Sequence, residues 1–67
     1  MSKYSPLWHY IQNEDKDVLR LTFGQIEQIA GIAVDHSFLR YKKELTDYGY
    51  QVFRISLKEE TVIFQKL

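Results

Sequence analysis

The side chains best suited to a chemical role are basic and polar groups gathered just after Asp35. Arginine can pair with guanine in the major groove of DNA, and lysine and serine bind phosphate oxygens. Carried on a helix, such groups would contact double-stranded DNA at base edges and along the backbone. The polar face of any surface helix has a similar composition, so a purely structural role stays open. The candidate DNA-binding residues are His36, Ser37, Arg40, Tyr41, Lys43, Arg54 and Lys58.

Patterns for catalysis and metal binding are weak by comparison. There is no cysteine, and neither of the two histidines lies in a recognisable hydrolase motif. A metal site would need His, Asp or Glu clustered at ligand spacing, which two isolated histidines do not supply. Acidic residues at 14–17 and 59–60 fall in expected turns, where carboxylates are usually solvated. We therefore expect no enzyme, no metal and no cofactor.

The charge of the chain limits its possible partners. The 67 residues carry nine basic and nine acidic side chains, so the formal net charge is zero. A neutral chain binds nucleic acid and anionic membranes weakly unless it makes specific contacts. Residues 36–58 nevertheless hold five basic and two acidic side chains. This local positive excess coincides with most of the candidate DNA-binding residues.

The length and hydropathy of the chain indicate one small domain, residues 1–67, in the cytoplasm. A chain of 67 residues is near the lower limit at which a hydrophobic core is stable unaided. No apolar run approaches the roughly 20 residues of a membrane span. The first residues also lack the apolar centre of a signal peptide. We therefore expect no membrane association.

Residues 22–31 carry the clearest helix signals in the chain. Thr22 and Gln25 have the capping-box spacing, in which each side chain accepts the free backbone N–H of the other residue. Gly31 can adopt the left-handed conformation that commonly ends a helix. The sequence therefore predicts a short helix with a defined beginning and a defined end.

A second helix is expected to follow after a short apolar link and to carry the candidate DNA-binding residues except Arg54 and Lys58, which are expected on the wing. Asp35 is the expected N-cap, with Ser37 as the alternative, and Gly49 ends the helix. Apolar side chains that recur every three or four residues mark its buried face. They are Phe38, Tyr41, Leu45 and Tyr48.

The flanking segments supply one more helix and three strands. Ser5 is the expected N-cap and Pro6 the first residue of an N-terminal helix that ends near Asn13, with Trp8 in the core. Alternating apolar residues indicate short half-buried strands. The strands are expected over residues 18–22, 50–57 and 61–64, with a bulge near Val52 and Phe53 and a turn at residues 58–60.

The resulting order is helix, strand, helix, helix, strand, strand, which is typical of a winged helix-turn-helix. We therefore expect an α+β fold with three helices against a small antiparallel sheet. In this sheet the first strand would pair with the C-terminal hairpin. A different small α+β packing is the main alternative.

Four motifs extend over nearly the whole chain. Residues 3–10 read Lys-Tyr-Ser-Pro-Leu-Trp-His-Tyr, and residues 22–31 read Thr-Phe-Gly-Gln-Ile-Glu-Gln-Ile-Ala-Gly; Gly49-Tyr50-x-Val52 and Thr61-Val62-x-Phe64 follow. With these motifs the chain resembles a small bacterial and phage-borne domain family of unknown function. Residues 35–37 and 42–43 depart from that family, whose members are richer in Arg and Trp there. Because the family has no assigned activity, the resemblance implies no function.

Two functions from different classes fit these patterns. The first is a regulatory DNA-binding module that reads DNA with its third helix. The second is a protein-binding module or small phage-type inhibitor without catalytic activity, which the neutral charge and the surplus of tyrosines support. The acidic pair Glu59 and Glu60 on the expected wing argues against DNA. A homodimer is possible in both cases.

Overall fold

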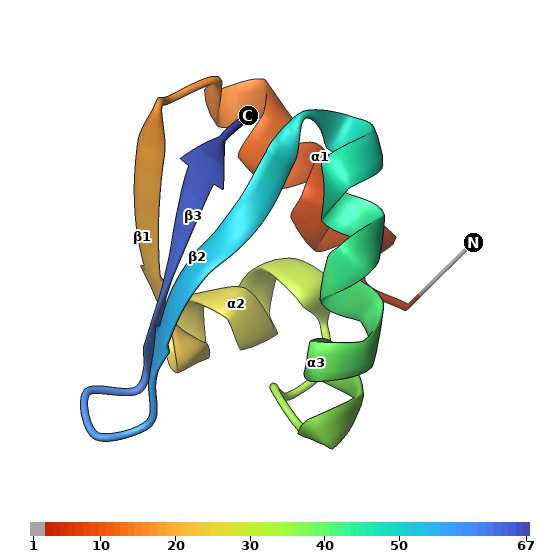
Figure 1. Cartoon of the computed structure of the whole chain (residues 1–67). Helices are drawn as coiled ribbons and strands as arrows, with labels where there is room; N and C mark the ends of the chain where they lie inside the picture. The colour runs from red at the N-terminus through yellow and green to blue at the C-terminus, as the bar shows by residue number, and fades with distance from the viewer. Residues whose placement is uncertain (1–2) are drawn as a thin grey trace.

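The computed structural model describes residues 3–67, which form an α+β fold (Figure 1). The helices and strands come in the expected order along the chain, except that a 3-10 helix lies between the third α-helix and the second strand. The three strands form one antiparallel sheet. None of the helices within residues 3–67 is long and apolar enough to cross a bilayer. The elements are α1 (Ser5–Glu14), β1 (Val18–Thr22), α2 (Phe23–Ala30), α3 (His36–Tyr41), η1 (Lys42–Tyr48), β2 (Tyr50–Ser56) and β3 (Thr61–Lys66).

The sheet has the order β1-β3-β2, so the hairpin strand β3 is central and both other strands are edges. Leu19 and Leu21 of β1 stand opposite Phe64 and Val62 of β3, and all four side chains are buried. The pairing of β2 with β3 shifts between Val52 and Arg54, which confirms the expected bulge. The first strand pairs with the hairpin as the sequence predicts.

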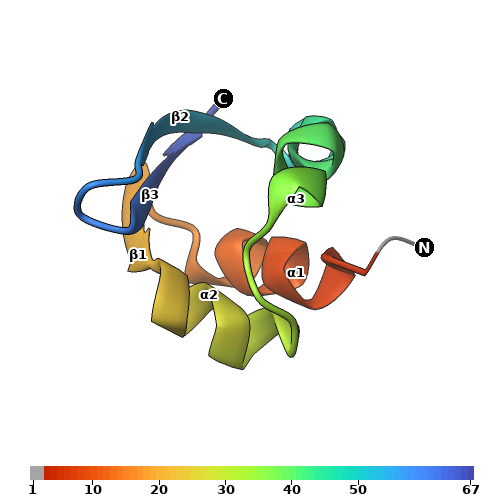
Figure 2. The same cartoon turned by 90° about the horizontal axis from the view of Figure 1, so that it is seen from below.

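The helices lie on one side of this sheet, as the view from below shows (Figure 2). Trp8 is fully buried, as expected, and its indole N–H donates to Glu44 Oε1 at 3.2 Å. Every buried side-chain nitrogen or oxygen within the described residues has a hydrogen-bond partner. The largest fully buried side chains are Trp8, Tyr4, Phe38, Phe64, Leu7, Ile11, Ile26, Leu45 and Val62.

The helix ends of α2 are those that the sequence predicts. Gln25 N–H donates to Thr22 Oγ1 at 3.1 Å, and Thr22 N–H donates to Gln25 Oε1 at 2.9 Å, which completes the capping box. Gly31 ends the helix with φ 77°. Asp35 rather than Ser37 is the N-cap of α3, because its carboxylate accepts the Ser37 N–H at 2.8 Å.

The expected start of α1 is wrong by one residue. Ser5 is the first helical residue, and Tyr4 holds the cap position without a side-chain cap hydrogen bond. The reason is tertiary: the Tyr4 ring is fully buried, while its carbonyl accepts the N–H groups of Leu7 and Trp8. Helical hydrogen bonding therefore begins before Ser5. The helix ends at Glu14, one residue beyond the expected end at Asn13.

The single helix expected between Asp35 and Gly49 is also wrong. The α-helix ends at Tyr41, and the chain continues to Tyr48 as the 3-10 helix η1. Because a 3-10 helix has three residues per turn, Leu45 and Tyr48 lie on the same side of η1. Leu45 is fully buried there. Gly49 then ends the helix with φ 86°.

Candidate binding groove

The expected DNA-binding residues of α3 and η1 differ in how accessible they are. His36, Arg40 and Lys43 are exposed. Ser37 is occupied by the helix cap, because both its backbone N–H and its hydroxyl donate to Asp35 Oδ1. Tyr41 is half-buried, with its ring centroid 5.9 Å from that of Tyr4. Only the three exposed side chains are free to meet a ligand.

The expected DNA-binding residues of the hairpin do not join this set. Arg54 stands opposite Ile63 of β3, and Arg20 of β1 stands opposite the same Ile63 from the other side. Directly opposed residues share a face of the sheet. Ile55, the neighbour of Arg54, faces α3, so Arg54 points to the other face. Lys58 is exposed in the turn between β2 and β3.

The five tyrosine side chains, which were expected to be partly exposed, differ in how accessible they are. Tyr4 and Tyr50 are buried, Tyr41 and Tyr48 are half-buried, and Tyr10 is 37% exposed. The Tyr50 hydroxyl donates to the Lys16 carbonyl at 2.7 Å, so this side chain also ties the α1–β1 turn to β2. The tyrosines therefore serve mainly the core, and they form no surface patch.

An apolar groove of about 430 Å³ lies between α3, the start of α2 and the β2–β3 hairpin. Leu39 of α3 is 51% exposed, and Leu57, the first residue of the turn after β2, is 79% exposed. The floor includes Phe38, which is 1% exposed and belongs to the core. We call this feature the apolar groove. Its lining residues are Phe23, Val34, Asp35, His36, Phe38, Leu39, Ile55 and Leu57.

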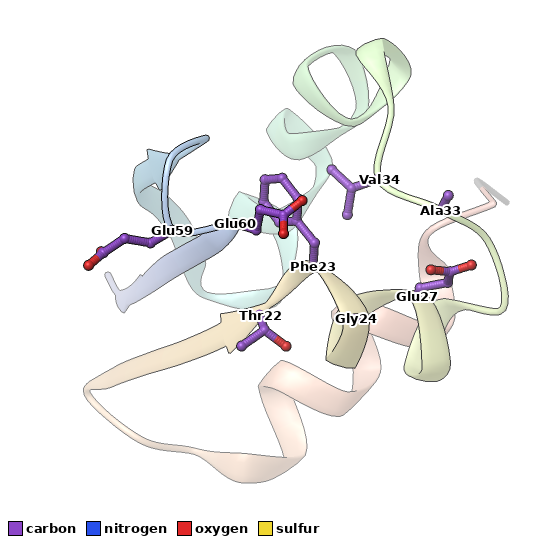
Figure 3. A pocket seen from close by; sticks show the side chains of 8 residues that line it. All are labelled: Thr22, Phe23, Gly24, Glu27, Ala33, Val34, Glu59 and Glu60. Carbon is purple, nitrogen blue, oxygen red and sulfur yellow. The ribbon is translucent and has the colours of Figure 1, made fainter.

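A second hollow of about 400 Å³ adjoins the apolar groove and is shown in Figure 3. Phe23 and Val34 line both hollows. We call the second hollow the acidic end, because three of its lining residues are glutamates. Its lining residues are Thr22, Phe23, Gly24, Glu27, Ala33, Val34, Glu59 and Glu60.

The chain topology brings these segments together. The start of α2 follows β1 directly, and β1 is paired with β3, so Phe23 meets the turn that precedes β3. Phe23 N–H donates to the Glu60 carbonyl at 2.8 Å. Glu60 has φ 54°, a left-handed conformation that a residue other than glycine rarely adopts. The hairpin turn is thereby fixed against the beginning of α2.

Asp35 lies where the apolar groove borders the aromatic core. Hydrogen bonds from the Ser37 hydroxyl and N–H hold the pKa of Asp35 below its usual value, and Lys3, with Nζ 3.8 Å from Oδ2, contributes to the same effect. The Tyr4 hydroxyl also lies 3.5 Å from Asp35 Oδ1. The carboxylate is therefore a charged cap that is already paired.

Neither hollow holds a set of residues suited to metal chemistry. Residues 3–67 contain no group of three or more His, Cys, Asp or Glu side chains that could hold a metal ion. Together the two hollows instead combine apolar side chains with the carboxylates of the acidic end. Two weak signals of this surface were present in the sequence: Leu39 falls outside the buried periodicity of its helix, and Glu59 and Glu60 stand out as the acidic part of the turn.

Comparisons with protein-family models, with curated proteins and with solved structures each found no significant match. The resemblance of the sequence motifs to a family of unknown function stays a prediction.

Proposed function

We propose that this chain is a protein-binding domain without catalytic activity, and that the apolar groove holds a segment of another protein. One observation carries the proposal. Leu39 and Leu57 come from different elements, yet both expose apolar side chains on the same concave surface. Covering the exposed parts of both would contribute roughly 2–4 kcal/mol to binding. Concave apolar surfaces of this kind are the usual sites at which an apolar segment docks.

We further propose that the domain is a winged helix-turn-helix. The strand order β1-β3-β2, the consecutive helices α2 and α3, and the β2–β3 hairpin support this assignment. In this arrangement the apolar groove lies between the second helix of the pair and the wing. A winged helix with basic side chains on this surface could bind nucleic acid there, whereas this chain would use the surface to bind a protein.

The test is selection of peptides from a random displayed library with the full chain as bait. The selected peptides are expected to shift the methyl resonances of Leu39 and Leu57 in NMR spectra and to lose binding to Leu39→Gln/Leu57→Gln. Leu67→Gln is the matched control, because Leu67 is 66% exposed and lies outside the groove. A library that yields no peptide, or only peptides that bind elsewhere, would contradict the proposal.

Binding of double-stranded DNA is the second candidate function. His36 and Arg40 are exposed on α3, with Lys43 exposed on η1 and Lys58 on the hairpin turn. In a mobility-shift assay on mixed-sequence duplex at low salt, DNA binding requires a shift that Arg40→Ala/Lys43→Ala weakens. Absence of any shift at low salt would exclude this candidate.

A further inference from the structure

We infer that the partner segment of the groove is cationic: a short stretch with apolar anchor side chains followed by lysine or arginine. This inference rests on the proposed protein-binding function and goes beyond it, because it names the chemistry of the partner. The apolar groove would take the anchors, and the acidic end would take the basic side chains.

The two hollows adjoin each other on the surface. Phe23 and Val34 belong to the lining of both. On one side of this shared wall lie Leu39 and Leu57, and on the other side lie Gly24 and the glutamates. A single extended or helical segment can therefore cross from the apolar half into the acidic half.

The charged side chains at the acidic end carry negative charge. The acidic end is lined by Glu27 of α2 and by Glu59 and Glu60 of the hairpin turn. Neither hollow has a lysine or an arginine in its lining. In Figure 3 Glu27 lies on α2 beyond Gly24, Glu60 overlaps Phe23 in the view, and Glu59 points away from the other lining side chains. The charged side chains in the lining of the acidic end are thus all carboxylates, although the whole chain is neutral and Glu59 also borders a further hollow lined by Arg20 and Arg54.

These carboxylates are not used within the fold. The ion pairs among residues 3–67 join Lys3 to Asp35 and Lys66 to Asp15. The carboxylates of Glu27, Glu59 and Glu60 take part in no ion pair or side-chain hydrogen bond within that range. Four acidic side chains elsewhere, those of Glu14, Asp15, Asp35 and Glu44, have a partner within the fold, whereas the three at the acidic end do not. A cationic partner would supply one, whereas DNA phosphate would be repelled there.

The experiment compares peptides selected by the wild type with their affinity for charge variants. Peptides selected by the wild-type chain are expected to be enriched in Lys and Arg next to apolar residues. Their affinity should fall roughly tenfold for Glu27→Gln/Glu60→Gln, because each exposed charge pair contributes modestly. Raising the salt concentration should weaken the wild-type complex and bring it close to that variant.

The matched control is Asp17→Asn/Asp47→Asn, which removes two exposed charges outside both hollows. This variant is expected to bind the selected peptides as the wild type does. An equal loss with the control would mean that net charge alone decides the affinity, and would overturn the inference. Circular dichroism spectra of both variants establish that the fold is intact.

The remaining outcomes separate the inference from the function on which it rests. Peptides that shift Leu39 and Leu57 but show no basic enrichment and no response to Glu27→Gln/Glu60→Gln would overturn the inference and leave the proposed function standing. A library without groove-binding peptides would overturn both. A concentration-dependent dimer that Leu39→Gln/Leu57→Gln abolishes would assign the groove to a second copy of the chain and also overturn the inference.

Discussion

The two sides of α3 meet very different surroundings. On one side, Phe38 packs edge-on against Tyr4, with ring centroids 5.4 Å apart, and lies 6.0 Å from Trp8. Tyr4 and Trp8 are fully buried, and the indole N–H of Trp8 donates to Glu44. On the other side, Leu39 and Leu57 border the apolar groove and remain exposed. Consecutive residues of one helix, Phe38 and Leu39, are 1% and 51% exposed.

This contrast separates what holds the fold together from what the fold presents. Burial of the aromatic rings removes a large apolar area from water and therefore contributes strongly to the free energy of unfolding. The groove leucines contribute little to it, because most of their surface stays in water in the folded state. Mutation of the exposed groove leucines should thus leave the fold intact. Mutation of the buried rings of Tyr4, Trp8 and Phe38, which we call the aromatic cluster, should not.

Trp8→Ala should give the largest effect, because it removes the centre of the aromatic cluster. Loss of a buried tryptophan typically costs about 3–5 kcal/mol of unfolding free energy. A domain of this size has roughly 3–10 kcal/mol in total, so the variant should be largely unfolded or strongly destabilised. Urea denaturation followed by circular dichroism measures the change. Trp8→Phe, which keeps a ring but loses the bond to Glu44, should cost less; an equal cost would show that the indole N–H decides.

Gly31→Ala should have an intermediate effect, because Gly31 begins the segment that links α2 to α3. In this link Ala33 accepts a hydrogen bond from Tyr4, and Val34 lines the groove. A Cβ at Gly31 would meet nothing within 4 Å, so the whole cost, about 1–2 kcal/mol, comes from φ 77°. Gly24→Ala is the control within α2 and should stabilise by about 0.5–1 kcal/mol. Chemical denaturation distinguishes the two signs.

Asp35 lies between the aromatic cluster and the apolar groove, and Asp35→Asn tests how its charge affects stability as the pH changes. The Ser37 hydrogen bonds lower the pKa of Asp35 in the folded state from its ordinary value of 3.8, so the charged carboxylate stabilises the fold above that pH. As the pH falls through the lower folded value, this contribution is lost. The wild type should therefore lose unfolding free energy between about pH 5 and pH 2 more steeply than Asp35→Asn, which keeps a capping side chain. Parallel pH profiles for the two proteins would contradict this.

Leu39→Gln/Leu57→Gln should have the smallest effect on stability. Exposed substitutions of this kind usually change the unfolding free energy by no more than about 0.5 kcal/mol each, and glutamine keeps a good helix propensity. Denaturation midpoints of wild type, this variant and Leu67→Gln should nearly coincide. A loss comparable to that of Gly31→Ala would mean that the groove is part of the core, and the contrast across α3 would not hold.

The elements whose signals are local could be predicted from the sequence. The capping box of Thr22 and Gln25, the left-handed Gly31 and Gly49, and the alternation in β1 each depend on neighbouring residues, and each is present as expected. The bulge in β2 was readable from the change of parity of its apolar residues. Such features need no knowledge of the rest of the fold.

Features that depend on distant segments were not predictable. Tyr4 displaces the expected cap Ser5 because its ring is buried against α3, far along the chain. The change from α3 to η1 places Leu45 and Tyr48 on the same side of the helix. The spacing of the apolar residues does not distinguish this arrangement from a continuous α-helix. The groove needs Phe23, Val34 and Leu57 in one place, and only the sheet topology brings them there. Arg54 was expected to contact DNA from the wing because its side of the sheet was unknown.

The central position of β3 has a consequence for the order of folding. Ser56 and Thr61 are paired across the hairpin and lie five positions apart, whereas Thr22 and Thr61, paired between β1 and β3, lie 39 apart. Closing the longer loop costs roughly 2 kcal/mol more in chain entropy, so the hairpin can close before β1 arrives. During that interval one edge of β3 is open. Refolding at high concentration should therefore favour exchange of β1 between chains, with two molecules completing each other's sheets.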